Sequence, residues 1–194
     1  MARTAAHRIA SERRAPIERQ LALEIRSFKF GYAVLEMNNL LDWGICWFPP
    51  GEPASAIDRL AFLLRVYAPA VAVARSTRRA DHESSENAAQ VLRKVRAELR
   101  RRSVPFAVVQ RREVRKFFGQ AGYVNKHEIA GAVAEQFNEL KPRVPRLRKA
   151  WDPESGITPV FDAVATGIAF AAYQKTRQDH PMSTSAIAGP SADV

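Results

Sequence analysis

Residues 21–36, LALEIRSFKFGYAVLE, contain the pattern that decides the fold of this chain. Two apolar runs of strand length, 21–25 and 32–37, lie on either side of a short polar turn. A third apolar run covers residues 41–48, and the Pro-Pro-Gly sequence at 49–51 then interrupts the chain. Consecutive strands joined by short turns can pair as an antiparallel meander, so we expect these three strands to do so.

Beyond residue 51 the hydrophobic pattern alternates between helical and strand-like segments. Apolar residues recur at helical spacing after Ser55, and this helix must end near Pro69. Two short apolar segments further on are typical of strands in a parallel sheet, which helical crossovers must connect. The expected elements are a strand at 71–74, a helix at 87–102, a strand at 104–109, a short basic helix ending at Gly119, a helix from Asn125 and a last helix from about Thr158.

This order predicts an α/β fold with a mixed five-stranded sheet, flanked by helices, whose first three strands form the antiparallel meander. We expect one folded domain over residues 20–176, because domains usually contain about 100 to 200 residues. The arginine-rich residues 1–19 predict a disordered basic arm or, alternatively, a phosphate-contacting tail. The Ser/Ala/Pro-rich residues 177–194 predict a disordered tail.

The charge of the chain is strongly unbalanced. Thirty Lys and Arg residues oppose twenty Asp and Glu residues, which gives a net charge of +10. Such an excess favours a polyanionic partner, because each phosphate that the protein neutralises releases condensed counterions. The simpler interpretation is a basic surface that serves solubility in an arginine-rich proteome.

Several common classes of protein are excluded by what the sequence lacks. The single cysteine, Cys46, cannot form an internal disulfide or a cysteine-rich zinc site, and it predicts a reducing, cytoplasmic environment. No apolar run approaches the roughly 20 residues that span a membrane, so we expect no membrane partner. A glycine-rich phosphate loop, a nucleophile elbow and a zinc-protease motif are also missing.

Five segments resemble, in the same order, parts of the RuvC-type endonucleases of the RNase H-like superfamily. Residues 21–36 resemble the first two strands, where an acid ends the first strand and a Gly-Tyr or Gly-Trp pair opens the second. Residues 70–75 resemble the strand that ends in the second acid of the family. Residues 108–116, 125–129 and 161–165 resemble a strand-to-helix segment, a lysine-led helix start and the last helix with its inward aspartate. The resemblance covers most of the predicted domain.

The resemblance implies a metal-dependent nuclease site built from carboxylates. Two Mg²⁺ or Mn²⁺ ions about 3.5–4 Å apart can activate a water and neutralise the leaving oxygen, and carboxylates are natural ligands for them. It places Glu24 and Asp162 as catalytic residues and metal ligands, with Glu154 as a further ligand from the preceding loop. Lys126, as a third catalytic residue, would steady the scissile phosphate.

Two residues depart from the family pattern. Glu24 occurs where the family usually has an aspartate, and Arg75 occupies the position of the middle-strand acid. A guanidinium adds fixed positive charge and cannot lose its proton. Arg75 could pair with Glu24 and Asp162 and so fill the site without metal. Alternatively, the following polar loop supplies a displaced ligand from Asp81, Glu83 or Glu86.

Each candidate also has a purely structural interpretation. Glu24 could be a surface acid at a strand end, and Asp162 would stabilise the dipole of its helix by about 0.3–1 kcal/mol. Glu128 lies three residues after Asn125, the spacing of a capping box, and capping is its favoured interpretation. Lys126 could simply be solvated, and Arg75 could be an ordinary surface arginine.

Two basic groups favour nucleic-acid binding. The group within residues 143–151 is stiffened by Pro142 and Pro145, and Trp151 ends it. Trp151 either stacks on a base, which would contribute about 1–3 kcal/mol, or packs beneath the loop. The candidate nucleic-acid-binding residues are Arg111, Arg112, Arg115 and Lys116 in the first group, and Arg143, Arg146, Arg148, Lys149 and Trp151 in the second.

These observations leave three functions open. The first is a Mg²⁺- or Mn²⁺-dependent endonuclease that cleaves branched DNA, such as a Holliday junction in DNA recombination, and for which the resemblance implies a homodimer. The second is a catalytically inactive DNA-binding relative. The third is a protein-interaction domain on the same fold, whose positive charge is incidental.

Overall fold

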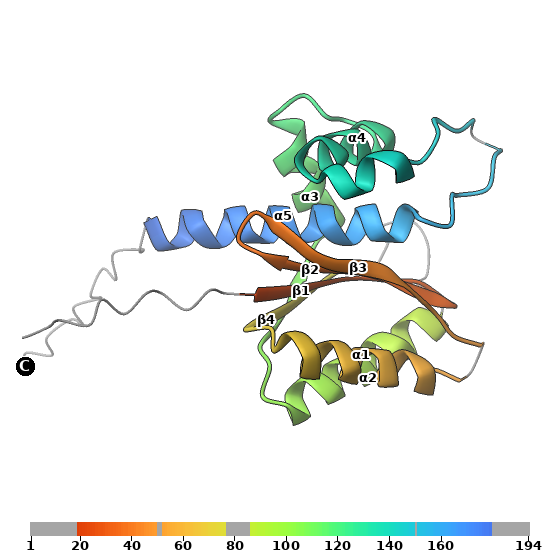
Figure 1. Ribbon diagram of the computed structural model, residues 1–194, viewed down its shortest axis with the longest axis vertical. Coiled ribbons are helices and arrows are strands. Elements are labelled where there is room, and N and C mark those ends of the chain that lie inside the picture. The colour runs from red at the N-terminus through yellow and green to blue at the C-terminus, as the bar shows by residue number, and fades with distance from the viewer. Residues whose placement is uncertain (1–18, 50–51, 77–85, 150, 180–194) are drawn as a thin grey trace, which may run out of the picture.

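The computed structural model describes residues 19–49, 52–76, 86–149 and 151–179. A central sheet separates two helical layers (Figure 1). The strands are β1 (Arg19–Ile25), β2 (Lys29–Glu36), β3 (Asn39–Trp47), β4 (Val71–Arg75) and β5 (Phe106–Val109). The helices are α1 (Ala54–Tyr67), α2 (Glu86–Arg101), α3 (Arg111–Gly119), α4 (Lys126–Gln136), the 3-10 helix η1 (Asn138–Arg143) and α5 (Thr158–Asp179). Within these ranges no helix is both long and apolar enough to cross a membrane.

The five strands are ordered β3-β2-β1-β4-β5, with β1 in the centre. The antiparallel pairs β1 with β2 and β2 with β3 form the predicted meander. The strand β4 pairs in parallel with both β1 and β5, as the helical crossovers allow. The predicted mixed α/β sheet is therefore confirmed. Because β1 and β4 are parallel neighbours, their carboxyl ends lie at the same end of the sheet.

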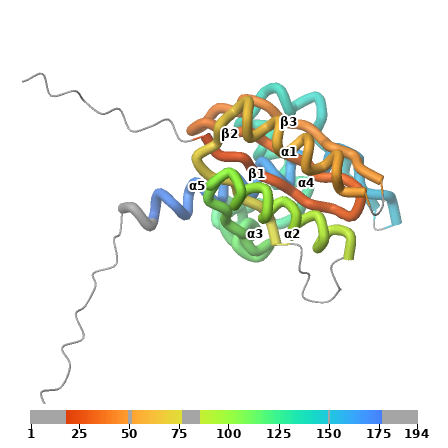
Figure 2. The backbone as a smooth tube through the Cα atoms, turned by 90° about the horizontal axis from the view of Figure 1, so that it is seen from below, coloured from red at the N-terminus to blue at the C-terminus, as the bar shows by residue number. Residues whose placement is uncertain are grey.

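Each face of the sheet carries its own hydrophobic core, because successive strand residues point to opposite sides. On β1, Leu21 and Leu23 join a core with α1 and α2. Figure 2 views the molecule from that side, with both helices in front of the strands. Ala22 instead joins the core formed with α5 and α4. The same alternation directs Glu24 toward the α5 side of the sheet.

The helix α5 approaches β1 and β2 closely at two glycines. A Cβ atom at Gly31 would lie 2.3 Å from the carbonyl carbon and oxygen of Pro159, in the first turn of α5. A Cβ atom at Gly167 would lie 2.4 Å from Cδ1 of Leu35. The buried Gln20 side chain donates to the Gly167 carbonyl at 3.1 Å. The contact at Gly31 places the start of α5 against the end of the sheet where β1 ends, and the contacts at Gly167 hold the middle of the helix against the same face.

Several element boundaries differ from the sequence-based expectations. The helix α5 continues to Asp179, so the predicted domain end at residue 176 falls inside the helix. A helix can extend through polar residues at an exposed end, where no apolar stripe marks it. Strand β1 begins at Arg19, one residue before the expected start of the domain. The loop expected after α4 begins with η1, whose Leu140 is fully buried and anchors the turn to the core.

We expect Gly31→Ala to destabilise the protein by about 1–3 kcal/mol, because the added methyl group would collide with the backbone of Pro159. Urea denaturation measures this change. Gly131→Ala is the matched control, since a Cβ atom there meets nothing within 4 Å on α4 and should stabilise the helix by up to about 1 kcal/mol. Equal effects of the two substitutions would contradict the close approach of α5 to β2.

Candidate functional site

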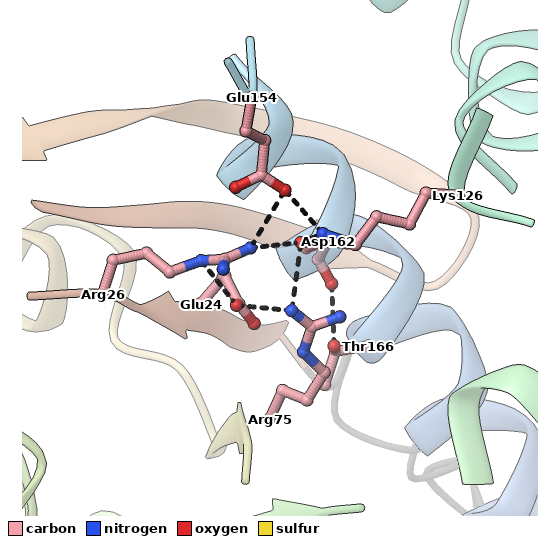
Figure 3. Close-up of polar contacts among 7 residues, drawn as sticks. All are labelled: Glu24, Arg26, Arg75, Lys126, Glu154, Asp162 and Thr166. Carbon is pink, nitrogen blue, oxygen red and sulfur yellow. Dashed lines mark hydrogen bonds and ion pairs between the residues drawn. The ribbon is translucent and has the colours of Figure 1, made fainter. Parts of the chain in front are cut away.

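Two carboxylates from distant parts of the chain meet where β1 and β4 end (Figure 3). Glu24, near the end of β1, is buried, and Asp162 lies close to the start of α5. Arg75, the last residue of β4, joins them: its Nη2 atom is 2.5 Å from Glu24 Oε1 and 3.0 Å from Asp162 Oδ2. The structure thus brings together the three residues that the resemblance placed at one site.

Arg26 supplies a second guanidinium to the same carboxylates. Its Nη2 atom donates to Asp162 Oδ2 at 2.7 Å and lies 3.6 Å from Glu154 Oε1. Its Nε atom lies 2.9 Å from Glu24 Oε1 without forming a hydrogen bond. Sequence reasoning missed this residue. The available signal was its position two residues after Glu24, which places both side chains on the same side of the chain.

Lys126 reaches the carboxylates from the first turn of α4. Its Nζ atom donates to Glu154 Oε1 at 2.5 Å and lies 3.5 Å from Asp162 Oδ2. The start of α4 is held by Asn125, whose side chain accepts from the Glu128 N–H at 3.0 Å. Glu128 in turn accepts from the Asn125 N–H at 3.2 Å, so the predicted capping box is confirmed.

The site therefore contains equal numbers of cationic and anionic side chains. We call this set the charged cluster. The balance between the two kinds of charge matters for stability, because burying a carboxylate without a cationic partner costs several kcal/mol of desolvation. The charged cluster consists of Glu24, Glu154, Asp162, Arg26, Arg75 and Lys126.

Burial and neighbouring charges act in opposite directions on the pKa values in the charged cluster. Burial lowers the pKa of Arg75, but Glu24 and Asp162 raise it above its usual value, so the guanidinium stays protonated. Burial alone would raise the pKa of Asp162, yet Arg75, Lys126 and Arg26 together hold it below its usual range. Burial raises the pKa of Glu24, and the opposing effect of Arg75 is smaller.

A cavity of about 1020 Å³ opens beside the charged cluster, between the start of α4, the loop after η1 and the start of α5. Lys126, Glu154 and Asp162 contribute to its lining. The cavity connects the charged cluster to the second predicted basic group. The exposed arginines of that group that line it are Arg143, Arg146 and Arg148.

Trp151 stands outside the protein core at the end of this basic loop. Its side chain is 77% exposed, which excludes the interpretation that it packs beneath the loop. Lys149 Nζ lies 5.5 Å from the centroid of its ring. Asp152 shapes the loop, because its side chain accepts from the Lys149 N–H and its carbonyl accepts from Arg148 Nη1, both at 2.8 Å.

The first basic group reaches the charged cluster from α3. Arg111 and Arg115 line a small hollow together with Asp162. Arg112 and Lys116 are exposed on the same helix but do not line this hollow. Both predicted basic groups therefore include residues that border the charged cluster.

No protein-family model and no curated protein sequence matches this chain. Among solved structures, T. thermophilus RuvC in complex with a Holliday junction substrate matches with a TM-score of 0.62 and 17% identity, covering 82% of this chain and 96% of that chain. A Thermus thermophilus RuvC structure matches with a TM-score of 0.63 and 18% identity, covering 81% and 96%. The fold is RuvC-like. The RNase H-like fold predicted from the five segments is thereby confirmed.

The divalent-metal site that the RuvC resemblance implies does not fit the charged cluster as it is arranged. Mg²⁺ and Mn²⁺ need carboxylate oxygens, and Oε1 of Glu24 and Oδ2 of Asp162 already face the guanidiniums of Arg26 and Arg75. Fixed positive charge lies where dications would have to bind. Among the described residues, no group of three or more His, Cys, Asp or Glu side chains is arranged to hold a metal ion.

Of the three acids that could supply a displaced ligand from the polar loop, the structure describes only Glu86. Asp81 and Glu83 lie outside the described residues. Glu86 begins α2, where its side chain is 84% exposed and pairs with Arg93 at 2.9 Å. Glu86 therefore does not complete the charged cluster.

We expect Arg75→Met to destabilise the protein by about 3 kcal/mol or more, because it removes a cation from the buried Glu24 and the largely buried Asp162 and leaves both only partly compensated. Urea denaturation near neutral pH measures the loss. Arg93→Met is the control: it breaks an exposed ion pair and should change stability by less than about 0.5 kcal/mol. If the Arg75 variant is as stable as the control, the guanidinium does not compensate these acids.

Proposed function

We propose that this protein binds DNA through the basic surfaces around the charged cluster and does not cleave it with metal ions. The observation that carries the proposal is the Arg75 bridge between Glu24 and Asp162. In this arrangement, cations of the protein itself occupy the place that the resemblance assigns to metal ions. The proposal keeps the DNA-binding part of the resemblance to RuvC and sets aside the catalytic part.

The charge balance of the charged cluster supports DNA binding. Uncompensated carboxylates would repel the phosphate backbone, whereas Arg26, Arg75 and Lys126 offset the three acids here. Arg75 is only 9% exposed, so its proposed role is to neutralise the acids and not to contact DNA. Direct phosphate contacts fall to the exposed arginines around it.

The basic groups supply a path for DNA on both sides of the charged cluster. One side is the cavity with the arginines of the 143–148 loop, and the other is α3 with Arg111 and Arg115. Trp151 is exposed at the end of the first path and is proposed to stack on a base. Arg112, Lys116 and Lys149 would add phosphate contacts. The net charge of +10 favours the same partner.

Branched DNA is the proposed ligand class. The solved T. thermophilus RuvC complex contains a Holliday junction substrate, and the present fold matches that protein over 96% of its chain. A four-way junction presents two symmetric strands, so we also propose a homodimer. We also propose a cytoplasmic role in DNA recombination, which the same resemblance and the single cysteine support.

We expect binding of a fluorescently labelled four-way junction to persist in EDTA and to weaken steeply as salt rises from about 50 to 200 mM. Fluorescence anisotropy measures the dissociation constant at each salt concentration. Alanine at Arg143, Arg146 and Arg148 should reduce the salt slope by about three, one for each lost phosphate contact. The control removes the same charge from the opposite helical layer, at Arg93, Lys94 and Arg100 of α2, and should leave the slope nearly unchanged.

Three results would contradict this proposal. Equal salt slopes for the two triple variants would mean that the arginines lining the cavity do not contact the DNA. Loss of binding in EDTA would mean that a metal ion holds the DNA. An undetectable interaction at low salt would favour the protein-interaction alternative for this fold.

The endonuclease alternative is tested separately. We expect no cleavage of four-way junctions in Mg²⁺ or Mn²⁺, because both metals would have to displace Arg26 and Arg75 from Glu24 and Asp162. Denaturing gel electrophoresis of end-labelled strands measures cleavage. Metal-dependent cleavage that Asp162→Asn abolishes would restore the nuclease assignment, with Lys126 beside the scissile phosphate.

A further inference from the structure

A row of side chains crosses the end of the sheet, one step beyond Glu24. In the strand register Glu24 pairs with Gly31, and Gly31 pairs with Ile45. The next positions on the same side, toward the end of the sheet, are the residue directly after β1, the residue two before Gly31 and the residue two after Ile45. We call these positions the edge row, which consists of Arg26, Lys29 and Trp47.

The edge row is continuous across three strands. The Arg26 N–H donates to the Lys29 carbonyl at 2.9 Å, and Lys29 pairs with Trp47 across β2 and β3. Arg26 reaches Asp162 on α5, which shows that this side of the sheet is the one that carries the charged cluster. The edge row therefore leads from the charged cluster to β3, the strand at the edge of the sheet.

Trp47 ends this row in an exposed position. Its side chain is 61% exposed, so most of a large apolar ring gains nothing from burial in the protein. Lys29 Nζ lies 4.3 Å from the ring centroid, a cation–π distance that orients the ring. An exposed, oriented aromatic ring beside a cation is the combination with which proteins bind single-stranded nucleic acid.

We propose that Trp47 stacks on an unpaired base of single-stranded DNA that passes the charged cluster, while Lys29 binds a neighbouring phosphate. The inference rests on the proposed DNA binding and adds to it a preference for unpaired bases. A duplex base is already stacked on both sides and offers no face to the ring, whereas branched DNA exposes such faces where its strands separate. Base–aromatic stacking tolerates any sequence, so the preference concerns structure and not sequence.

Tryptophan fluorescence tests this proposal directly. The chain has three tryptophans, so Trp43→Phe combined with Trp151→Phe leaves Trp47 as the single emitter. We expect titration with a short single-stranded oligothymidylate to quench this emission saturably, and rising salt to reverse the quenching. In the otherwise natural chain, Trp47→Ala should weaken oligothymidylate binding by about five- to 150-fold, and Trp47→Phe should retain most of the affinity.

Phe62→Ala is the control for the loss of an exposed ring. Phe62 lies on α1, in the layer on the other side of the sheet, and also has a cation beside it, with Arg65 Cζ 5.9 Å from its ring centroid. This variant should bind within about twofold of the natural chain. Anisotropy of the labelled oligonucleotide measures binding independently of the tryptophan signal.

The outcomes separate this inference from the proposed function. Binding by anisotropy without quenching of Trp47, or equal affinities of the Trp47→Ala and Phe62→Ala variants, would overturn the stacking role and leave DNA binding intact. A Trp47 emission that changes with protein concentration in the absence of DNA would also overturn it, because a second copy would then cover the ring. Absence of any DNA binding at low salt would remove both proposals.

Discussion

The ion pairs that Arg75 forms with Glu24 and Asp162 are the constraint on which the rest of the site depends. They join residues that lie 51 and 87 positions apart in the chain, at the ends of two parallel strands and at the start of the last helix. The close contact of Gly31 with Pro159 brings that helix to the sheet. The buried carboxylate of Glu24 and the largely buried carboxylate of Asp162 require compensating positive charge, and the strand next to β1 supplies it through Arg75.

The choice of an arginine as the counter-charge has consequences for function. A metal ion can dissociate or exchange, whereas a guanidinium on a strand is covalently fixed and always charged. Arg26 and Lys126 extend the same compensation to Glu154, so the charged cluster is balanced by side chains alone. On this RuvC-like fold the acids are therefore held by cations of the chain itself, next to a surface with exposed arginines.

Strand and helix periodicity predicted the sheet, because it shows which segments are strands and which are crossover helices. The expectation that Glu24, Arg75 and Asp162 share one site came from the resemblance to the RuvC-type endonucleases, and the parallel pairing of β1 with β4 brings the first two side by side. Arg26 was missed although it lies two residues after Glu24 and therefore on the same side of the chain, because the resemblance directed attention to the acids and not to their counter-charges. Trp47 was missed because an apolar run at a sheet edge looks like a buried strand until the strand order is known. The cavity was also beyond prediction, because its shape depends on how three segments distant in the chain pack together.

A guanidinium of the protein lies where the RuvC resemblance implies metal ions. The most direct test is the change in the thermal unfolding midpoint on addition of Mn²⁺, compared between the natural chain and Arg75→Glu. A ligand that binds only the folded state raises this midpoint. We predict no rise for the natural chain and a rise for Arg75→Glu, in which a third carboxylate replaces the guanidinium. A rise for the natural chain that Asp162→Asn abolishes would contradict this prediction.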